Sequence, residues 1–294
     1  MPIEATLPPV TLVAGCKINL SLEITGRRED GYHFLESVFW PLRYPVDTLH
    51  VTCTSQDGIR LECSDPALET SDNILIKAYN AFSEATSFSP GLSVFLQKNI
   101  PYGAGLGGGS SDAAALLLYC NRLAQTENAP SLSAEKLSQL GARLGADVPF
   151  FLHNVPCLIR GIGDIIEPLP SRVVCSFSGL HLVLVCPKIH VATAWAFSAW
   201  DKKDHSDTLT NRHEKDSSPL VHGVRIRNDL CRTVFDHYPE LKETHTLLND
   251  FGAEATSMSG SGSSLFGIFS DHANAKKALC FFQDKGEIVF HHIL

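Results

Sequence analysis

The chain has 294 residues, of which 44% are hydrophobic and 19% are charged, and its formal net charge is -8. This composition is typical of a globular protein with a buried core, and it excludes a largely disordered chain. The acidic balance, without any run rich in Lys and Arg, argues against nucleic-acid binding. Nine cysteines with no CxxC pair, no export signal and no apolar run of ~18 residues predict a cytoplasmic protein with reduced thiols and no membrane segment.

The first quarter of the chain is predicted to be rich in β-strands. Alternating apolar residues indicate strands over 10–25 and 33–42, with a turn at 29–31 between them. Residues 48–54 and 58–63 are expected to form a hairpin.

Helices and strands alternate through the rest of the chain. In chain order we expect a helix capped by Ser71 or Asp72 and running to 82, a strand at 92–97, helices at 110–123 and 133–144, and a strand at 182–186. Residues 202–219 are polar and lack an apolar face, so we expect an unstructured insertion. Helices at 228–238 and 240–251, a strand at 264–270, a helix at 273–283 and a strand at 287–290 complete an α+β pattern, with two lobes that meet around 150–180.

A glycine-rich loop, Pro101–Ser111, is the strongest functional signal. Five of the seven residues from Gly103 to Gly109 are glycine, which permits positive φ and lets several backbone N–H groups converge on one anion. The loop leads into an Ala- and Leu-rich helix, whose N-terminus favours negative charge. We therefore predict that this loop holds phosphates.

Three other interpretations of the loop fit the sequence less well. Gly103, Gly105 and Gly108 fit the GxGxxG dinucleotide fingerprint, but the next ~35 residues look helical, without the strand and acidic residue that the fingerprint requires. A Walker A loop needs a lysine that this loop lacks. A plain surface turn does not explain Ser110 and Ser111 at the start of a helix.

Several other residues are candidates for chemistry. Lys17 interrupts an apolar strand beside Asn19, and a buried ammonium needs a partner. Asp147 lies between a glycine turn and a proline, and we predict that it is this partner. No Cys or His cluster has zinc spacing, and the adjacent histidines at 291–292 are not at helical ligand spacing, so no protein-held metal is predicted.

These segments together resemble the GHMP-type kinases, which include galactokinase, homoserine kinase and mevalonate kinase. The matching segments occur in family order at 14–20 (AGCKINL), 30–33 (DGYH), 100–114, 144–149 (LGADVP) and 258–263 (MSGSGS). The segments at 30–33 and 144–149 resemble the branch that phosphorylates a cytidine-diphosphate-linked methylerythritol in the non-mevalonate isoprenoid pathway. Two departures are Gly15-Cys16, where the family has Pro-Ala, and Cys231, where Glu is common.

The resemblance implies a two-lobed α+β GHMP kinase fold. Residues 1–165 would form a ribosomal-protein-S5-like ATP-binding lobe, and residues 166–294 a ferredoxin-like α/β lobe. It implies ATP-dependent phosphorylation of the C2 hydroxyl of the cytidyl substrate, by a monomer or homodimer with no nucleic-acid or membrane partner. The alternatives are a GHMP kinase for another alcohol, such as homoserine or mevalonate, and a non-catalytic nucleotide-binding protein. Adjacent rings at Tyr32 and His33 argue against the first, since those alcohols have no base.

The resemblance also implies roles for individual residues. Asp147 would take the proton of the acceptor hydroxyl, Lys17 would hold Asp147 ionised and stabilise developing charge, and Asn19 would orient the substrate. Residues implied for ATP are Asn73, at the adenine, and Pro101, Tyr102, Gly103, Ala104, Gly105, Leu106, Gly107, Gly108, Gly109, Ser110 and Ser111, around the phosphates. Residues implied for the cytidine end are Tyr32, stacked on the base, His33, at its edge, Phe197, on its other face, and Thr193. Mg²⁺ is expected with ATP, with Ser110 or Ser111 as its only suggested protein contacts.

Overall fold

The computed structural model describes residues 8–203 and 218–294, which form two compact units. Unit 1 consists of the chain up to Cys16, Arg43–Ile100 and Gly107–Asn154; unit 2 consists of Lys17–Leu42, Pro101–Leu106 and the chain from Val155 onward. The two longest strands, β1 (Val10–Arg27) and β2 (His33–Thr54), contribute to both units. The predicted division of the chain at residue 165 remains a prediction, because these units are discontinuous along the sequence.

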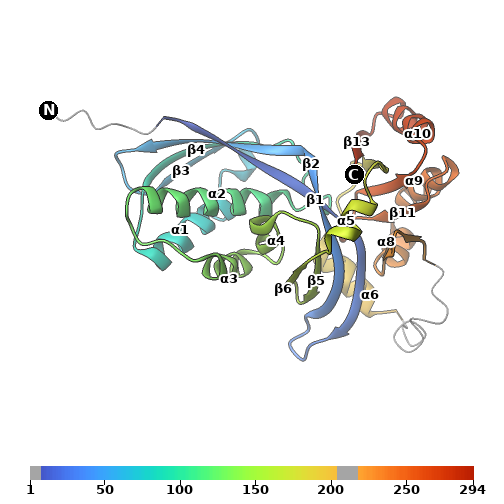
Figure 1. The fold of residues 1–294 in the computed structure, drawn as a ribbon, viewed down its shortest axis with the longest axis horizontal. Helices are drawn as coiled ribbons and strands as arrows, with labels where there is room; N and C mark the ends of the chain where they lie inside the picture. Colours follow the sequence, from blue (N-terminus) through green and yellow to red (C-terminus); the bar gives the residue numbers. More distant parts are fainter. Residues whose placement is uncertain (1–7, 204–217) are drawn as a thin grey trace. The chain divides into compact units, whose positions relative to one another are not determined.

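Unit 1 combines a sheet of strand order β1-β2-β4-β3 with four α-helices. Its further elements are β3 (Ile59–Cys63), the short 3-10 helix η1 (Pro66–Leu68), α1 (Ile74–Thr86), β4 (Gly91–Gln97), α2 (Gly108–Thr126), α3 (Ala134–Leu144) and α4 (Val148–His153). The helices α1, α2 and α3 lie on one side of this sheet (Figure 1). Apolar alternation at Leu92, Val94 and Leu96 in β4 directs these buried side chains toward the helices.

The predicted hairpin over 48–63 is wrong, because β4 lies between its two strands. Thr48–Thr54 of β2 pairs antiparallel with β4, and Ile59–Cys63 pairs parallel with the other edge of β4. A parallel pair needs a crossover connection, and α1 provides it between β3 and β4. The alternating pattern identified the strands correctly, but neighbours in sequence need not be neighbours in a sheet.

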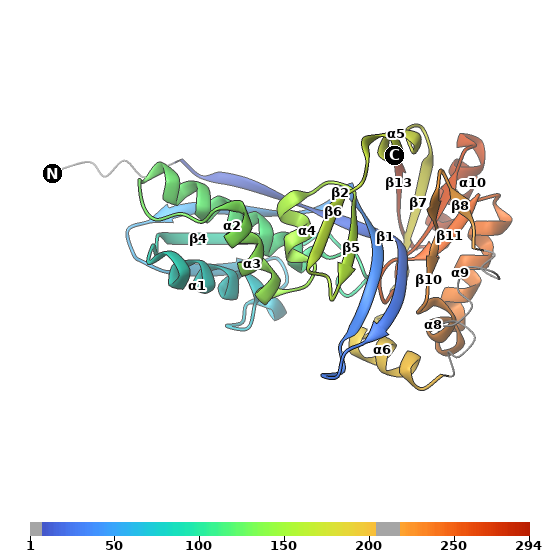
Figure 2. The ribbon, with the colours of Figure 1, turned by 60° about the horizontal axis from the view of Figure 1, so that its bottom comes forward.

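Unit 2 contains a four-stranded sheet, a small hairpin and the remaining strands of the seven-stranded sheet to which β3 and β4 also belong. In this unit those strands have the order β10-β1-β2-β5-β6, the four-stranded sheet has the order β11-β12-β7-β13, and β8 pairs with β9. The elements are β5 (Cys157–Gly161), β6 (Ile165–Pro168), α5 (Ser171–Ser176), β7 (His181–Cys186), α6 (Thr193–Asp201), β8 (Leu220–Val221), β9 (Val224–Arg225), β10 (Arg227–Asn228), α8 (Cys231–His237), α9 (Pro239–Asp250), β11 (Ala255–Met258), β12 (Leu265–Phe269), α10 (His272–Asp284) and β13 (Ile288–Ile293). The four-stranded sheet and its helices α9 and α10 are visible side by side in Figure 2.

The core of unit 2 lies between the four-stranded sheet and its helices. Val183 and Val185 of β7 pack in one buried cluster with Ala275, Ala278 and Phe282 of α10. Burial of such side chains stabilises the fold by about 1.5–3 kcal/mol each for the larger ones. This packing holds β7 in place. The position of β7 in turn sets that of the residues that follow it toward the predicted site.

Some predicted boundaries shift for local reasons. The first helix begins at Ile74, and its N-cap is Asn73 rather than Ser71 or Asp72. Helix α8 begins at Cys231 instead of 228, because Asn228 belongs to β10 and accepts a hydrogen bond from the backbone N–H of Leu230. Most of the predicted insertion at 202–219 lies outside the described residues.

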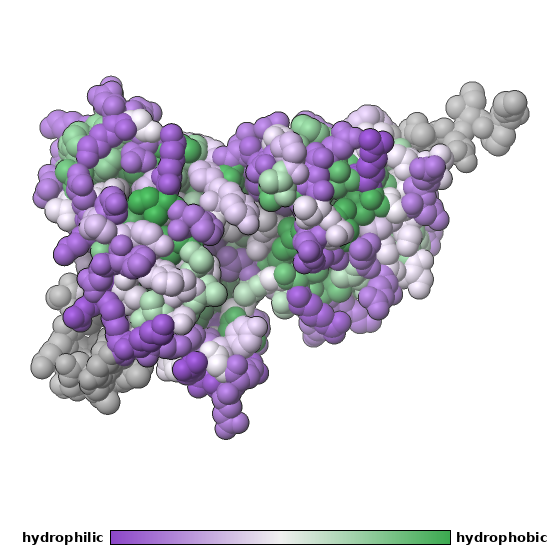
Figure 3. Space-filling view, turned by 180° about the vertical axis from the view of Figure 1, so that it is seen from behind, coloured by the Kyte–Doolittle hydropathy of each residue, from purple (hydrophilic) through white to green (hydrophobic). Residues whose placement is uncertain are grey.

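The surface mixes polar and apolar residues. Figure 3 shows hydrophilic residues spread over the visible face of each unit, with apolar residues in separate patches. Among the described residues, no helix is both long and apolar enough to cross a bilayer.

Candidate active site

The glycine-rich loop is shared between the two units. Its first part, Pro101–Leu106, belongs to unit 2, and Gly107 is the N-cap of α2 in unit 1. Gly105 has φ +75°, and a Cβ there would lie 2.1 Å from the carbonyl oxygen of Ser259. A side chain is therefore excluded both by the backbone conformation and by the neighbouring loop.

Lys17 is buried against the glycine loop. Its side-chain Nζ donates hydrogen bonds to Asn19 Oδ1 (2.6 Å) and to the backbone oxygen of Gly105 (3.0 Å), and it lies 4.7 Å from the ring centroid of Phe39. Asn19 in turn donates from Nδ2 to Ser37 Oγ at 2.9 Å. Because both ends of the Asn19 amide bind protein groups, this residue positions Lys17, and its predicted contact with substrate stays a prediction.

A second small-residue loop, 259–264, joins the same cluster. Ser259 Oγ donates to the backbone oxygen of Gly105 at 2.8 Å and accepts from the backbone N–H of Asn19 at 3.2 Å. Asn228 Nδ2 donates to the backbone oxygens of Met258 (2.8 Å) and Gly260 (2.7 Å). The segments of Lys17 and Ser259 thus meet at the carbonyl group of Gly105, and Asn228 holds the loop that carries Ser259.

The residues predicted for a cytidine base form another group in unit 2. The imidazole of His33 forms a 2.7 Å hydrogen bond through Nε2 with Asp201 Oδ1 and stacks on Phe197 at 5.0 Å between ring centroids. Tyr32 is 67% exposed. Thr193 Oγ1 lies 2.9 Å from Ser261 Oγ, so it is tied to the loop at 259–264.

The remaining predicted residues lie in unit 1. Asp147 precedes α4 and is half-buried, and Ser110 Oγ is 3.5 Å from the position of a Cβ on Gly145, two residues before Asp147. Unit 1 therefore brings the loop of Asp147 to the first turn of α2. The pairing of Asp147 with Lys17 of unit 2 stays a prediction.

Asn73 has a structural role that its predicted contact with adenine did not include. Its Oδ1 accepts from the backbone N–H of Leu75 at 2.9 Å, and its Nδ2 donates to the backbone oxygen of Leu68 at 2.8 Å. The side chain therefore caps α1 and fastens the preceding turn. Contact with adenine remains a prediction.

Family profiles and relatives show to which family the chain belongs. The profile described as GHMP kinases N terminal domain matches residues 73–154, and that described as GHMP kinases C terminal matches 215–288. The chain is similar to 4-diphosphocytidyl-2-C-methyl-D-erythritol kinases of Lawsonia intracellularis (40% identical, covering 97% of this chain and 96% of the relative) and Nitratidesulfovibrio vulgaris (41%, covering 97% and 99%). The chain belongs to the GHMP kinases.

A solved structure supports the same family membership. The crystal structure of a 4-(cytidine 5'-diphospho)-2C-methyl-D-erythritol kinase matches with a TM-score of 0.73 and 30% identity, covering 96% of this chain and 98% of that one. The expected α+β GHMP kinase fold and the expected class of small-molecule kinase are therefore confirmed.

A buried ionic group holds both ends of the glycine loop in this kinase, and no sequence pattern indicated it. Lys98 Nζ binds Asp47 and also Asp112 Oδ2 (2.8 Å), and Asp47 Oδ1 accepts from the backbone N–H groups of Asn99 (2.6 Å) and Ile100 (2.8 Å). Burial raises the pKa of Asp112 to about 7; the nearby Asp47 acts in the same direction, and Lys98 opposes both. Asp47 thus fixes the chain entering the loop, and Lys98 ties it to the first turn of α2.

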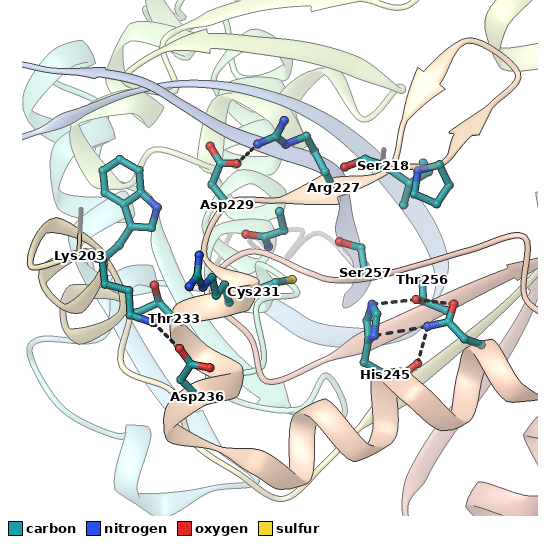
Figure 4. A pocket seen from close by; sticks show the side chains of 16 residues that line it. Lys203, Ser218, Arg227, Asp229, Cys231, Thr233, Asp236, His245, Thr256 and Ser257 are labelled. Carbon is teal, nitrogen blue, oxygen red and sulfur yellow. Dashed lines mark hydrogen bonds and ion pairs between the residues drawn. The ribbon is translucent and has the colours of Figure 1, made fainter. Parts of the chain in front are cut away.

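A cavity of about 850 Å³ lies elsewhere in unit 2, between α8, α9, β10 and β11 (Figure 4). Its walls carry the ion pair of Lys203 with Asp236 and the hydrogen bond between His245 and Thr256. None of the predicted site residues lines it. Its link with the site is Asn228, which lines the cavity and binds the loop at 259–264.

Proposed function

We propose that this kinase transfers the γ-phosphoryl group of ATP to the C2 hydroxyl of 4-diphosphocytidyl-2-C-methyl-D-erythritol, in the non-mevalonate route to isoprenoid precursors. The observation that carries the proposal is similarity over nearly the whole chain, at 40% and 41% identity, to kinases named for that substrate. The proposal includes a cytoplasmic location and small-molecule partners alone.

The glycine loop and α2 would bind the phosphates of ATP. Gly103, Gly105 and Gly107 all have positive φ, and no side chain caps the N-terminus of the 19-residue helix α2. The first N–H groups of that helix have no partner within the helix, and its dipole favours an anion there. Both features support binding of the β- and γ-phosphates at this point.

Asp147 and Lys17 would carry the chemistry. Phosphoryl transfer depends mainly on positioning and on neutralising charge. In our proposal Asp147 accepts the proton of the C2 hydroxyl, and Lys17 stabilises the negative charge that develops on the acceptor and the moving phosphoryl group. Support for Lys17 comes from its buried ammonium, which Asn19 and the carbonyl of Gly105 hold beside the glycine loop.

Recognition of the cytosine would depend on His33 and Tyr32. The carboxylate of Asp201 fixes the orientation of the His33 ring, and Phe197 packs against one face of that ring. A fixed imidazole is suited to hydrogen bonding at the edge of a base, and the exposed ring of Tyr32 is suited to stacking. Homoserine and mevalonate have no base that these groups would recognise.

Mg²⁺ would accompany ATP and neutralise phosphate charge. Of the polar side chains in the first turn of α2, the carboxylate of Asp112 is already bound to Lys98. The half-buried hydroxyl of Ser110 is the group in that turn that fits the cation, with phosphate oxygens and water as its other ligands.

The direct test mixes the protein with ATP and each of three acceptors: the cytidyl substrate, homoserine and mevalonate. We expect ADP release with the cytidyl substrate only. Activity on mevalonate or homoserine without activity on the cytidyl substrate would overturn the assignment. Absence of activity on all three, with ATP bound, would favour the non-catalytic alternative.

Replacing Asp147 tests the mechanism. We expect Asp147→Asn to lower kcat by about 10²-fold or more, the range for loss of a general base, while ATP binding persists. Asp57→Asn, in an exposed turn of the same unit, is the matched control and should leave kcat unchanged. Turnover of the Asp147→Asn variant near the wild-type rate would remove this carboxylate from the mechanism.

A further inference from the structure

Three histidines from three separate elements of unit 2 meet at one point. They are His181 at the start of β7, His272 at the start of α10 and His291 in β13, and their ligand nitrogens all lie within 4.8 Å of one another. His181 Nδ1 and His291 Nε2 are 3.0 Å apart. None of the three belongs to the predicted active site.

The sheet register explains why two of these rings face each other. His181 pairs with Ile293, and Val183 pairs with His291, across antiparallel β7 and β13. Residues two apart in a strand share a face, so His181 and His291 are diagonal neighbours on one face. Buried side chains of α10 pack on that same face against Val183. The ring of His272, at the start of α10, lies 4.8 Å from that of His181 and 5.9 Å from that of His291 between centroids.

The chemistry of the group suits a transition metal. Imidazole is a ligand for Zn²⁺, Cu²⁺ and Ni²⁺, and two nitrogens on a tetrahedral Zn²⁺ at about 2.0–2.1 Å are about 3.3 Å apart. The distance between His181 and His291 is already close to that. Burial, followed by the neighbouring histidines, lowers the pKa of His291, and burial and His272 lower that of His181. The neutral imidazole is the form that binds a cation, and an ion bound to both rings would replace the hydrogen bond that these two nitrogens share.

We propose that His181, His272 and His291 form a binding site for one divalent transition-metal ion, with Zn²⁺ as the fitting species and water as the fourth ligand. His272 is exposed, so an ion can reach the site from solvent. The Asp271 carboxylate, at the N-cap of α10, adds a negative charge near His181. The bound ion links the last strand of the chain to β7 and α10.

The site is structural, because it lies at the far end of β7 from the catalytic segments. The loop at 259–264 follows β11, and its next strand begins at Leu265, which pairs with Val185. Ser263 Oγ donates to the backbone oxygen of Pro187, just beyond Cys186. The strand from His181 to Cys186 spans about 17 Å at about 3.3 Å per residue. The ion therefore stabilises this end of the sheet and takes no part in phosphoryl transfer.

The test uses the full chain, stripped of metal with a chelator and then titrated with Zn²⁺ alone. We expect saturable binding of one ion per chain and a rise in Tm with Zn²⁺, because a ligand that binds the folded state stabilises it. His272→Gln should weaken Zn²⁺ binding by about tenfold or more, since loss of even an outer-shell partner costs about 10–100-fold. His153→Gln, at an exposed histidine of unit 1, is the matched control and should bind as the wild type does.

Cobalt distinguishes these histidines from the nine cysteines. We expect Co²⁺ to give visible d–d absorption without the near-ultraviolet charge-transfer band of a cobalt–thiolate bond. The proposal is overturned if the wild type shows no saturable Zn²⁺ binding, if His272→Gln binds Zn²⁺ as tightly as the wild type, or if the thiolate band appears. None of these readouts depends on kinase activity.

Discussion

Asp112 is a buried carboxyl group whose ionisation in the folded state is unfavourable. Its pKa rises from 3.8 to about 7, chiefly because of burial and also because of Asp47, although Lys98 binds it. Between these two pH values the folded chain holds a proton that the unfolded chain has lost. Stability contributed by this group therefore falls as the pH rises from about 4 to about 7, and it changes little above that.

Replacing Asp112 should remove this pH dependence. We expect the free energy of unfolding of Asp112→Asn, relative to the wild type, to increase by an amount on the order of 2 kcal/mol between pH 5 and pH 7. Urea unfolding at several pH values measures it. Asp236→Asn is the control: Lys203 lowers the pKa of that exposed carboxyl, so the folded and unfolded chains have both lost its proton between pH 5 and pH 7, and the relative stability of this variant should not change over that range. A relative stability of Asp112→Asn that is independent of pH would contradict the prediction.

The residues that sequence analysis missed share one property. Asp201 lies 168 residues from His33, and Asp47 lies 52 residues from Asn99, whose N–H it binds. Each is an ordinary acidic residue locally, and only the fold gives it a partner. Lys17 could be recognised because a charged residue in an apolar strand is unusual by itself. The glycine loop could be recognised because its composition is unusual by itself.

At the scale of elements, apolar periodicity predicted most helices and strands but not their pairing. The predicted strand at 182–186 and helix at 273–283 agree with β7 and α10 to within a residue. The predicted hairpin at 48–63 is wrong because the partner of β2 in this region is β4, which follows α1 in the sequence. Strand order depends on which edges α1 and β4 cover, and a local pattern does not contain that information.

The close contact between the glycine loop and the loop at 259–264 leads to a specific prediction at Gly105. A methyl group there would lie 2.1 Å from the carbonyl oxygen of Ser259, and φ is +75°. Gly286 has nearly the same φ, +77°, with no atom within 4 Å of its Cβ position. We expect Gly286→Ala to cost only the conformational penalty of about 1–2 kcal/mol. Gly105→Ala should cost about 2–4 kcal/mol, because overpacking adds to that penalty.

Urea unfolding of the two glycine variants provides the comparison, and ATP binding gives a second readout. Displacing Gly105 also moves the carbonyl group that Lys17 and Ser259 bind, so ATP affinity should fall in that variant alone. Equal loss of stability in both variants, with ATP affinity unchanged, would show that the two loops separate easily.

At the scale of the whole molecule, the exposure of the nine cysteines to solvent depends on how the chain is packed. All nine lie among the described residues, none forms a disulfide, and Cys175 and Cys280 are the exposed ones. Burial raises the pKa of Cys120 and of Cys231 to about 12. Since the thiolate is the reactive form, buried thiols of this kind react slowly.

A thiol titration of the native and unfolded protein tests this packing. We expect two thiols to react rapidly with 5,5'-dithiobis(2-nitrobenzoate) in the native protein, and all nine to react in denaturant without added reductant. The double variant Cys175→Ser/Cys280→Ser should lose the rapid phase and keep seven slow thiols. Fewer than nine thiols in the unfolded wild type would reveal disulfides, and it would contradict both the reduced state of the chain and the cytoplasmic location proposed from it. More than two rapid thiols in the native protein would instead mean that the fold opens readily at one of the seven cysteines that it buries or half-buries.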